Sequence, residues 1–204
     1  MNENTNNKMK SRDFITLGIF SVLFIAIFFV CLMCVSFAPI LQPFGIALTA
    51  LAGGPVYMLM RIKVNHFGGI IISGTLYALF MFATGSGWII LVSTIIGAVL
   101  ADLVNKASNN KSYTMLTVGY SVFMAFTALG SYLPYLVMRD YYVALSESSG
   151  VNGEFMTAVV ALMNGPMIMI AVAAAAVSAI LGALLARTML KKHFIKAGMV
   201  KEVA

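Results

Sequence analysis

Few side chains in this sequence could perform catalytic or redox chemistry, and each lacks a partner that the chemistry requires. Cys31 and Cys34 form a Cys-x-x-Cys pair within a continuous apolar run, whereas a redox or metal site needs polar neighbours or further ligands. Ser86 stands between two glycines, but His66 and His193 fall on the opposite side of the predicted topology, so no general base reaches its hydroxyl. The sequence therefore predicts no enzyme, no metal site and no cofactor.

Asp102 is the one acid within the predicted membrane helices, and it lies within about a turn of their polar end. Proton-coupled carriers usually rely on carboxylates or histidines deeper in the membrane. This pattern disfavours a proton-driven carrier, whereas Na+ coupling through backbone carbonyls stays open. We expect Asp102 to pair with Lys106 at the i+4 position rather than to act as a functional acid.

Polar and aromatic side chains gather instead at the predicted outer ends of the helices, where they could bind a small molecule. Three helices are predicted to start on this side, so the positive ends of their dipoles converge there. Donors, aromatic rings and one cation favour a small, flat or anionic organic ligand. The candidate ligand-binding residues are Gln42, Ser86, Trp88, Tyr132, Tyr135, Arg139 and Asn164. Structural alternatives stay open for them: an aromatic belt, helix caps, and an ion pair of Arg139 with Asp140 or a lipid phosphate.

The composition predicts the elements that must position these residues. The chain has 204 residues, of which 61% are hydrophobic and 10% charged, whereas soluble domains carry roughly 25% charged residues. Because about 20 apolar residues cross a bilayer, we expect about six membrane helices and no room for an ATPase domain. The net charge of +6 is divided among loops and tails, which does not form the basic stripe of a nucleic-acid-binding protein.

Six apolar stretches are predicted to be transmembrane helices: residues 14–36, 44–60, 67–84, 88–104, 113–138 and 166–187. They form a substrate-binding domain at 14–190, flanked by tails at 1–13 and 191–204. Residues 139–166 are predicted to lie outside. Their second half, 154–163, is helical in pattern but too short to span, so it forms a lid, a surface helix or the first turns of the last helix.

The basic residues predict the orientation. With both termini in the cytoplasm, all thirteen Lys and Arg residues except Arg139 fall on the inner side, as the positive-inside rule describes. Arg61 and Lys63 mark a tight turn between the second and third helices, where we expect them to face lipid headgroups or partner subunits. The sequence thus predicts an all-α, multi-pass protein of a bacterial-type cytoplasmic membrane.

Two helices carry packing signals. In the second helix, Gly53, Gly54 and Pro55 predict a kink. In the last helix, small residues recur at every fourth position, which lets membrane helices approach closely. This row, Ala171, Ala175, Ala179 and Ala183, either packs within the protein or binds a partner.

Residues 47–68, ALTALAGGPVYMLMRIKVNHFG, together with residues 12–20, RDFITLGIF, give the chain a resemblance to a known group of proteins. It resembles the substrate-binding S components of energy-coupling-factor (ECF) transporters and, within that group, the MptD, or Trep_Strep, family. The resemblance covers residues 12 to about 195 in length and helix count, and it is sharpest in 47–68.

The resemblance implies a six-helix fold that encloses a vitamin-like or micronutrient ligand on the extracytoplasmic side. It also implies a T-component membrane subunit and two cytosolic ATPases that power uptake. S components commonly dock through small residues of their first helix, where Gly18 and Ser21 stand without completing the usual Ala-x-x-x-Ala motif. With Arg61 and Lys63, these are the candidate partner-interface residues. The expected function is substrate capture for an ECF-type ABC importer; the alternative is a stand-alone permease or channel.

Overall fold

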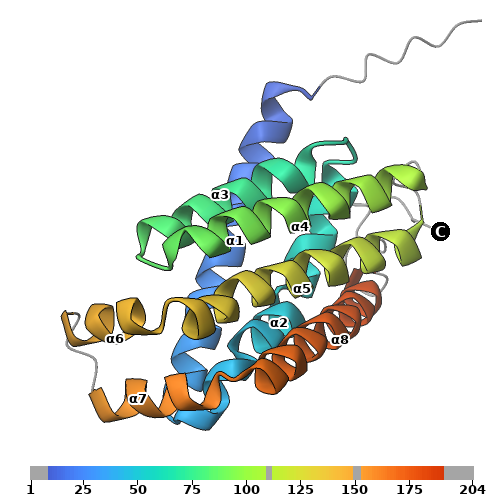
Figure 1. The fold of residues 1–204 in the computed structure, drawn as a ribbon. Helices are drawn as coiled ribbons and strands as arrows, with labels where there is room; N and C mark the ends of the chain where they lie inside the picture. The colour runs from blue at the N-terminus through green and yellow to red at the C-terminus, as the bar shows by residue number, and fades with distance from the viewer. Residues whose placement is uncertain (1–8, 109–111, 149–152, 191–204) are drawn as a thin grey trace, which may run out of the picture.

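The described part of the chain is helical throughout (Figure 1). The computed structural model describes residues 9–108, 112–148 and 153–190. The helices are α1 (Ser11–Val35), the 3-10 helix η1 (Pro39–Phe44), α2 (Gly45–Lys63), α3 (Gly69–Ala83), α4 (Gly87–Ala107), α5 (Tyr113–Val137), α6 (Arg139–Ser148), α7 (Gly153–Leu162) and α8 (Gly165–Met189). The expected tail at 191–204 and residues 1–8 of the other tail lie outside the described residues.

Five of these segments are long and apolar enough to cross a membrane: α1, η1 with α2, α4, α5 and α8. The sixth apolar helix, α3, has 15 residues, which at about 1.5 Å per residue gives about 22 Å. That length is short of the roughly 30 Å of a hydrocarbon core. Length and composition therefore support an all-α membrane protein with five candidate spans and one shorter apolar helix.

The six predicted helices lie within three residues of their predicted bounds. α1 begins at Ser11, inside the predicted tail, because the Asp13 side chain accepts a hydrogen bond from the Lys10 backbone N–H at 2.9 Å and so satisfies a donor of the first turn. The segment 139–166 contains two helices instead of one. α7 matches the short helix predicted at 154–163, whereas α6 was not predicted.

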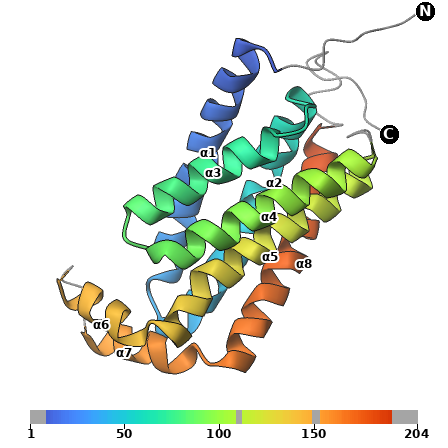
Figure 2. The same ribbon diagram turned by 45° about the horizontal axis from the view of Figure 1, so that its top comes forward.

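The six longer apolar helices pack as a closed ring in the order α1, α2, α8, α5, α4 and α3, with α3 returning to α1. Figures 1 and 2 show α1 inclined steeply to α3, with which it is in contact. Both views also place α6 and α7 together at one end of the bundle, where α7 contacts η1. We call this the α6–α7 end; α2, α4 and α8 all begin there, as predicted.

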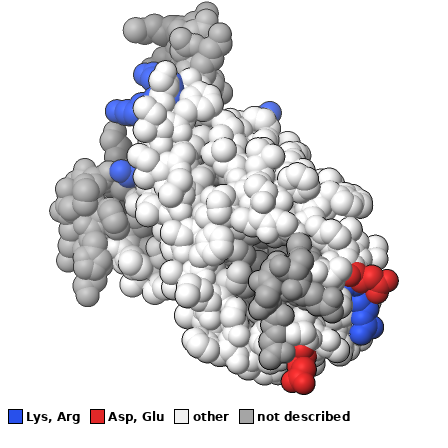
Figure 3. All heavy atoms as spheres, turned by 90° about the vertical axis from the view of Figure 1, so that its left-hand side faces the viewer, with Lys and Arg blue, Asp and Glu red and all other residues white. Residues whose placement is uncertain are grey.

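The described charges divide between the two ends of the bundle. The opposite end, which holds the α2–α3 turn, is called the basic end, and it contains Lys10, Arg12, Arg61, Lys63, Lys106 and Arg187. Arg139 lies at the α6–α7 end with Asp140 and Glu154. On the face seen in Figure 3, a broad uncharged surface separates the two charged groups.

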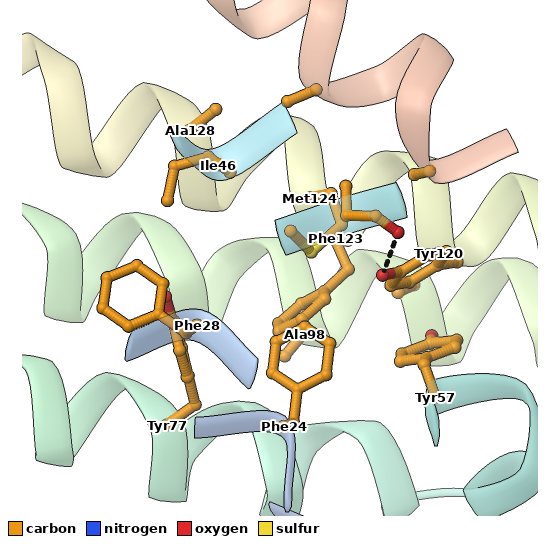
Figure 4. Close-up of a cluster of buried hydrophobic side chains, with 14 of the residues drawn as sticks. Phe24, Phe28, Ile46, Tyr57, Tyr77, Ala98, Tyr120, Phe123, Met124 and Ala128 are labelled. Atoms are coloured by element: carbon orange, nitrogen blue, oxygen red, sulfur yellow. Dashed lines mark hydrogen bonds between the residues drawn. The ribbon is translucent and has the colours of Figure 1, made fainter. Parts of the chain in front are cut away.

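Aromatic side chains fill the centre of the bundle (Figure 4). Tyr57 and Tyr120 stack with ring centroids 4.3 Å apart, and the Tyr120 hydroxyl donates a hydrogen bond to a backbone carbonyl of α2. Phe24 and Phe28 of α1 meet Tyr77 of α3 edge to face, at 5.8 and 5.7 Å. These contacts join four helices through geometries that aromatic rings prefer.

α2 and α8 approach so closely that glycine is required on both. A Cβ atom built on Gly54 would stand 2.4 Å from the carbonyl carbon of Gly182, and one on Gly182 would stand 2.5 Å from the carbonyl oxygen of Ala50. The predicted small-residue row of α8, Ala171, Ala175, Ala179 and Ala183, is fully buried. Packing within the protein is therefore confirmed for this row. α2 itself continues as one helix through Pro55.

Candidate functional site

A pocket of about 120 Å³ lies near the α6–α7 end of the bundle. Seven helices and the α3–α4 turn contribute to its wall, so residues far apart in sequence meet there. It is lined by Phe28 and Leu32 of α1, Gln42 of η1, Gly45 and Ile46 of α2, Met81 of α3, Ser86 of the turn, Ile90 of α4, Ser131, Tyr132 and Tyr135 of α5, and Tyr142 of α6. We call it the tyrosine pocket.

Tyr132 connects the pocket to the start of α2. Its hydroxyl accepts a hydrogen bond from the Ile46 N–H at 3.0 Å and donates one to the carbonyl oxygen of Gln42 at 3.3 Å. The first N–H groups of a helix have no partner within the helix, and no side chain of η1 caps α2. The buried Tyr132 hydroxyl therefore fixes the junction between η1 and α2 against α5.

Tyr142 of α6 covers the same pocket from the side of the α3–α4 turn. Its hydroxyl donates a hydrogen bond to the carbonyl oxygen of Ser86, and its ring lies 4.7 Å from that of Tyr135, centroid to centroid. Burial raises the pKa of the Tyr142 hydroxyl, and the neighbouring hydroxyls of Tyr135 and Tyr141 raise it further. The hydroxyl thus stays protonated and able to donate at neutral pH.

The Gly85–Gly87 turn presents the Ser86 carbonyl to Tyr142. Gly85 has φ of 90° and Gly87 has φ of 76°, values in the left-handed region that glycine adopts without a steric penalty. Ser86 is also the N-cap residue of α4, although its side chain makes no capping hydrogen bond. The backbone of this turn, and not a nucleophilic hydroxyl, is the part that the fold positions.

The structure brings four of the seven predicted ligand-binding residues into the tyrosine pocket: Gln42, Ser86, Tyr132 and Tyr135. The other three do not line it. Trp88 is 58% exposed and Arg139 is exposed at the start of α6. Asn164 caps α8, where its side-chain oxygen accepts a hydrogen bond from the Met167 N–H at 3.0 Å, so its cap alternative is confirmed.

Sequence reasoning missed Tyr142 and Ser131 as lining residues. Tyr142 follows Tyr141 in a stretch that we predicted only as an external segment. The available signal was the seven-residue spacing of Tyr135 and Tyr142, which places both on one face of a helical path. The break between α5 and α6 at Met138 hid that continuity.

At the basic end, Asp102 of α4 binds the beginning of α3. Its Oδ2 accepts hydrogen bonds from the N–H groups of Gly68, Ile70 and Ile71, each at 3.0 Å. Gly68 is the N-cap residue, with φ of 93°, and has no side chain to serve these donors. A carboxylate at a helix N-terminus is also favoured by the helix dipole, so Asp102 caps α3 from the neighbouring helix.

Arg61, near the end of α2, faces the other oxygen of the same carboxylate. Its Nη1 lies 3.5 Å from Asp102 Oδ1 and donates hydrogen bonds to the carbonyl oxygens of His66 and Val64 at 3.2 and 3.4 Å. The side chains of Arg61 and Asp102 are fully buried. The pair therefore joins the end of α2, the α2–α3 turn and α4.

Two expectations about this end are corrected. Asp102 does not pair with Lys106, whose Nζ instead lies 4.9 Å from the centroid of the Phe67 ring, because the carboxylate points into the bundle. Arg61 does not face lipid headgroups or a partner, since its side chain is enclosed in the bundle. Lys63 is exposed, as expected.

The remaining partner-interface candidates lie on α1. Gly18 is half-buried, and nothing lies within 4 Å of a Cβ atom built on it. Ser21 is 5% exposed and faces the bundle. Gly18 is therefore available to another protein, whereas Ser21 is not.

Comparison with known proteins gives one match. A family model described as a hypothetical bacterial integral membrane protein (Trep_Strep) matches residues 11–196. The match covers every helix from α1 to α8. Neither the curated proteins nor the solved structures contain a match to the chain.

Proposed function

The chain belongs to the Trep_Strep family of bacterial integral membrane proteins, and we propose that it captures the substrate of an ECF-type ABC importer. In this proposal it binds a small vitamin-like or micronutrient molecule and performs no catalysis. A T-component membrane subunit and two cytosolic ATPases move the substrate onward. The family membership and the resemblance of residues 47–68 to S components support this assignment.

The proposed topology has six spans with the basic end in the cytoplasm. The described Lys and Arg residues other than Arg139 lie at that end, in accord with the positive-inside rule. We include the short helix α3 as a span because it packs between α1 and α4 within the ring. This orientation puts the tyrosine pocket at the extracytoplasmic end.

The tyrosine pocket is the observation that carries the proposal. Ligand sites are usually concave, mostly apolar and furnished with a few polar groups, and this pocket combines aromatic and aliphatic walls with Gln42, Ser86 and Ser131. It lies where α2 and α4 begin, and Tyr142 of α6 covers it. A partly enclosed site beneath the short helix α6 suits the capture of a dilute solute before it is passed to the transport subunits.

The contacts of the buried Asp102 support a transport cycle that is powered by partner subunits and not by a proton gradient. Asp102 is the one acid predicted within the spans, and its carboxylate is engaged by the start of α3 and by Arg61. A proton carrier would have to release those contacts in every cycle. Coupling through partner ATPases does not require Asp102 to titrate.

The exposed side of α1 supports docking to a membrane partner. Of the five candidate spans, α1 has the smallest buried share, 28% of its most apolar window, against 61% for the span that contains α2. Gly18 lies on this helix with open space in front of it, and small residues allow close helix approach in lipid. We propose that α1 meets the T component there.

The proposal is tested by binding to the isolated chain. The protein is placed in lipid nanodiscs and titrated with a panel of vitamins and cofactor precursors, with thermal shift for screening and calorimetry for hits. Tight binding without ATP is the expected result. If the lone chain in liposomes instead drives net flux along an ion gradient, it is the stand-alone permease and the capture proposal is wrong.

A further inference from the structure

The walls of the tyrosine pocket are uncharged. Among the described residues that line it there is no Asp, Glu, Lys, Arg or His. Arg139, the cation expected to attract an anionic ligand, is exposed and does not line the pocket. A charged ligand would lose part of its hydration there without gaining an oppositely charged partner from these residues, which is unfavourable.

The pocket does offer neutral hydrogen-bonding groups. Within the described part of the chain, the side chains of Gln42 and Ser86 and the hydroxyl of Tyr135 have no hydrogen-bond partner. An amide and two hydroxyls can each donate and accept. A ligand that carries both donors and acceptors therefore finds complementary groups in this wall.

Tyr77 adds a fourth group directly behind the wall of the pocket, which it does not itself line. Its side chain is 2% exposed, and its hydroxyl has no hydrogen-bond partner among the described residues. Its ring packs 5.7 Å from that of Phe28, which lines the pocket, and Met81 lines the pocket one turn further along α3. Figure 4 shows the Tyr77 side chain passing the Phe28 ring and pointing toward Ile46, another lining residue. Such a buried hydroxyl is costly unless a partner meets it.

The size and the aromatic wall limit the ligand further. The volume of about 120 Å³ is close to the roughly 150 Å³ of a cavity that accepts benzene. The rings of Tyr135 and Tyr142 lie 4.7 Å apart and tilt by 39°, which presents aromatic surface to a flat molecule. A single ring with small substituents fits; a multi-ring molecule does not fit without movement of α6.

We propose that the tyrosine pocket selects an uncharged, planar, single-ring molecule with a hydrogen-bond donor and an acceptor, such as a ring carboxamide, and rejects its ionised counterparts. This inference rests on the proposed function of the pocket as the capture site. It replaces the broader expectation of a flat or anionic ligand. Tyr77 is the residue assigned to meet the ligand's polar group at the buried end.

The test uses three molecules of nearly equal shape and different charge. Benzamide is neutral, benzoate is an anion and benzamidine is a cation at neutral pH. Each is titrated against the whole chain in nanodiscs, and we expect benzamide to bind at least roughly ten-fold more tightly than either ion. Equal or tighter binding of an ion overturns the proposal, and so does the absence of benzamide binding at roughly 10 mM, a concentration at which single-ring fragments register.

Two matched variants test the role of Tyr77. Tyr77→Phe removes the unpartnered hydroxyl behind Phe28, which lines the pocket, and is expected to weaken benzamide binding roughly two- to ten-fold. Tyr57→Phe removes another buried hydroxyl, from a ring that stacks on Tyr120 and Phe123, neither of which lines the pocket, and is expected to leave binding unchanged. Equal effects of the two variants overturn the assignment of Tyr77. Gln42→Met supplies a second loss-of-binding variant if Tyr77→Phe does not fold.

Failure of this inference can be told apart from failure of the proposed function. If a charged molecule from the vitamin panel binds tightly, the proposed capture function is supported and the proposed selection for neutral molecules is refuted. If the chain prefers benzamide but transports solute without partner subunits, the inference about the pocket is supported and the assignment to an ECF-type importer is refuted. The two readouts, charge preference and flux without partners, are measured on the same preparation.

Discussion

The Asp102 carboxylate lies between Arg61 and the beginning of α3: Oδ1 is 3.5 Å from Arg61 Nη1, and Oδ2 accepts three backbone N–H groups. Since both side chains are fully buried, the charges are shielded from water and depend on each other. This relationship holds the α2–α3 turn on α4. Arg61, which the sequence analysis placed at the membrane surface, is therefore part of the protein core.

Asp102→Asn is expected to destabilise the protein by about 3–5 kcal/mol, because it leaves the Arg61 charge buried without its partner. Thermal unfolding in mild detergent measures the loss, and Asp140→Asn, at an exposed position of α6, serves as the control. The double variant Arg61→Met with Asp102→Asn should recover part of the stability, since Asn can still accept from the α3 N–H groups. An Asp102→Asn protein as stable as the wild type would refute this account of the turn.

Gly54→Ala is expected to cost about 1–3 kcal/mol or more, because overpacking a tight contact forces the helices to shift. The added Cβ would stand 2.4 Å from the backbone of Gly182, and a backbone atom cannot rotate away. Gly18→Ala is the matched control: it adds the same atom to a helix where nothing lies within 4 Å, so stability should stay equal or rise by up to about 1 kcal/mol. Similar melting temperatures for the two variants would contradict the close α2–α8 contact.

Tyr142→Phe tests the contact between α6 and the α3–α4 turn through its pH dependence. Because burial raises the pKa of Tyr142, the folded state favours the protonated hydroxyl. The stabilisation that the Tyr142 hydroxyl gives is fully present below the ordinary tyrosine pKa of about 10. It is lost as the pH rises through the higher pKa that Tyr142 has in the folded protein. The difference in melting temperature between wild type and Tyr142→Phe should therefore be constant from neutral pH to about 10 and shrink above it. A difference that shrinks well below that pH would show that another group controls the contact.

Gly18→Phe is expected to reduce co-purification of the T component without reducing stability or ligand binding. The new side chain enters open space on the protein's own surface, so it disturbs only a partner that approaches α1 closely. Val30→Phe, at a position of α1 that is 61% exposed, is the control and should retain the partner. Loss of the partner in both variants, or in neither, would move the docking surface away from Gly18.

The longer helices could be predicted from the sequence because their apolar stretches are local signals. The predicted stretches 113–138 and 166–187 correspond to α5 and α8. The Asp102–Arg61 pair could not be predicted, because it depends on which helices become neighbours. The local i+4 rule pointed to Lys106, but the helix rotates the carboxylate into the bundle, where Arg61 and the open end of α3 lie.

The site could be predicted in part for the same reason. Gln42, Ser86, Tyr132 and Tyr135 follow from the shared end of the helices, and these four line the pocket. Trp88 and Arg139 stand at the same end but on outward faces, and sequence position near a helix end does not give the direction of a side chain. The contact of Tyr142 depends on how α6 folds back over the α3–α4 turn, which the seven-residue spacing from Tyr135 alone does not specify.

Purification of the affinity-tagged chain from its own bacterial membranes tests the central claim most directly. The solubilised material is examined by native mass spectrometry, with the Gly18→Phe variant as a matched preparation. The account predicts that the wild-type chain travels with one T-component membrane subunit and two ATPase subunits, and that the variant loses them. A wild-type chain that is isolated without these subunits, and that carries solute across liposomes alone, would contradict the account.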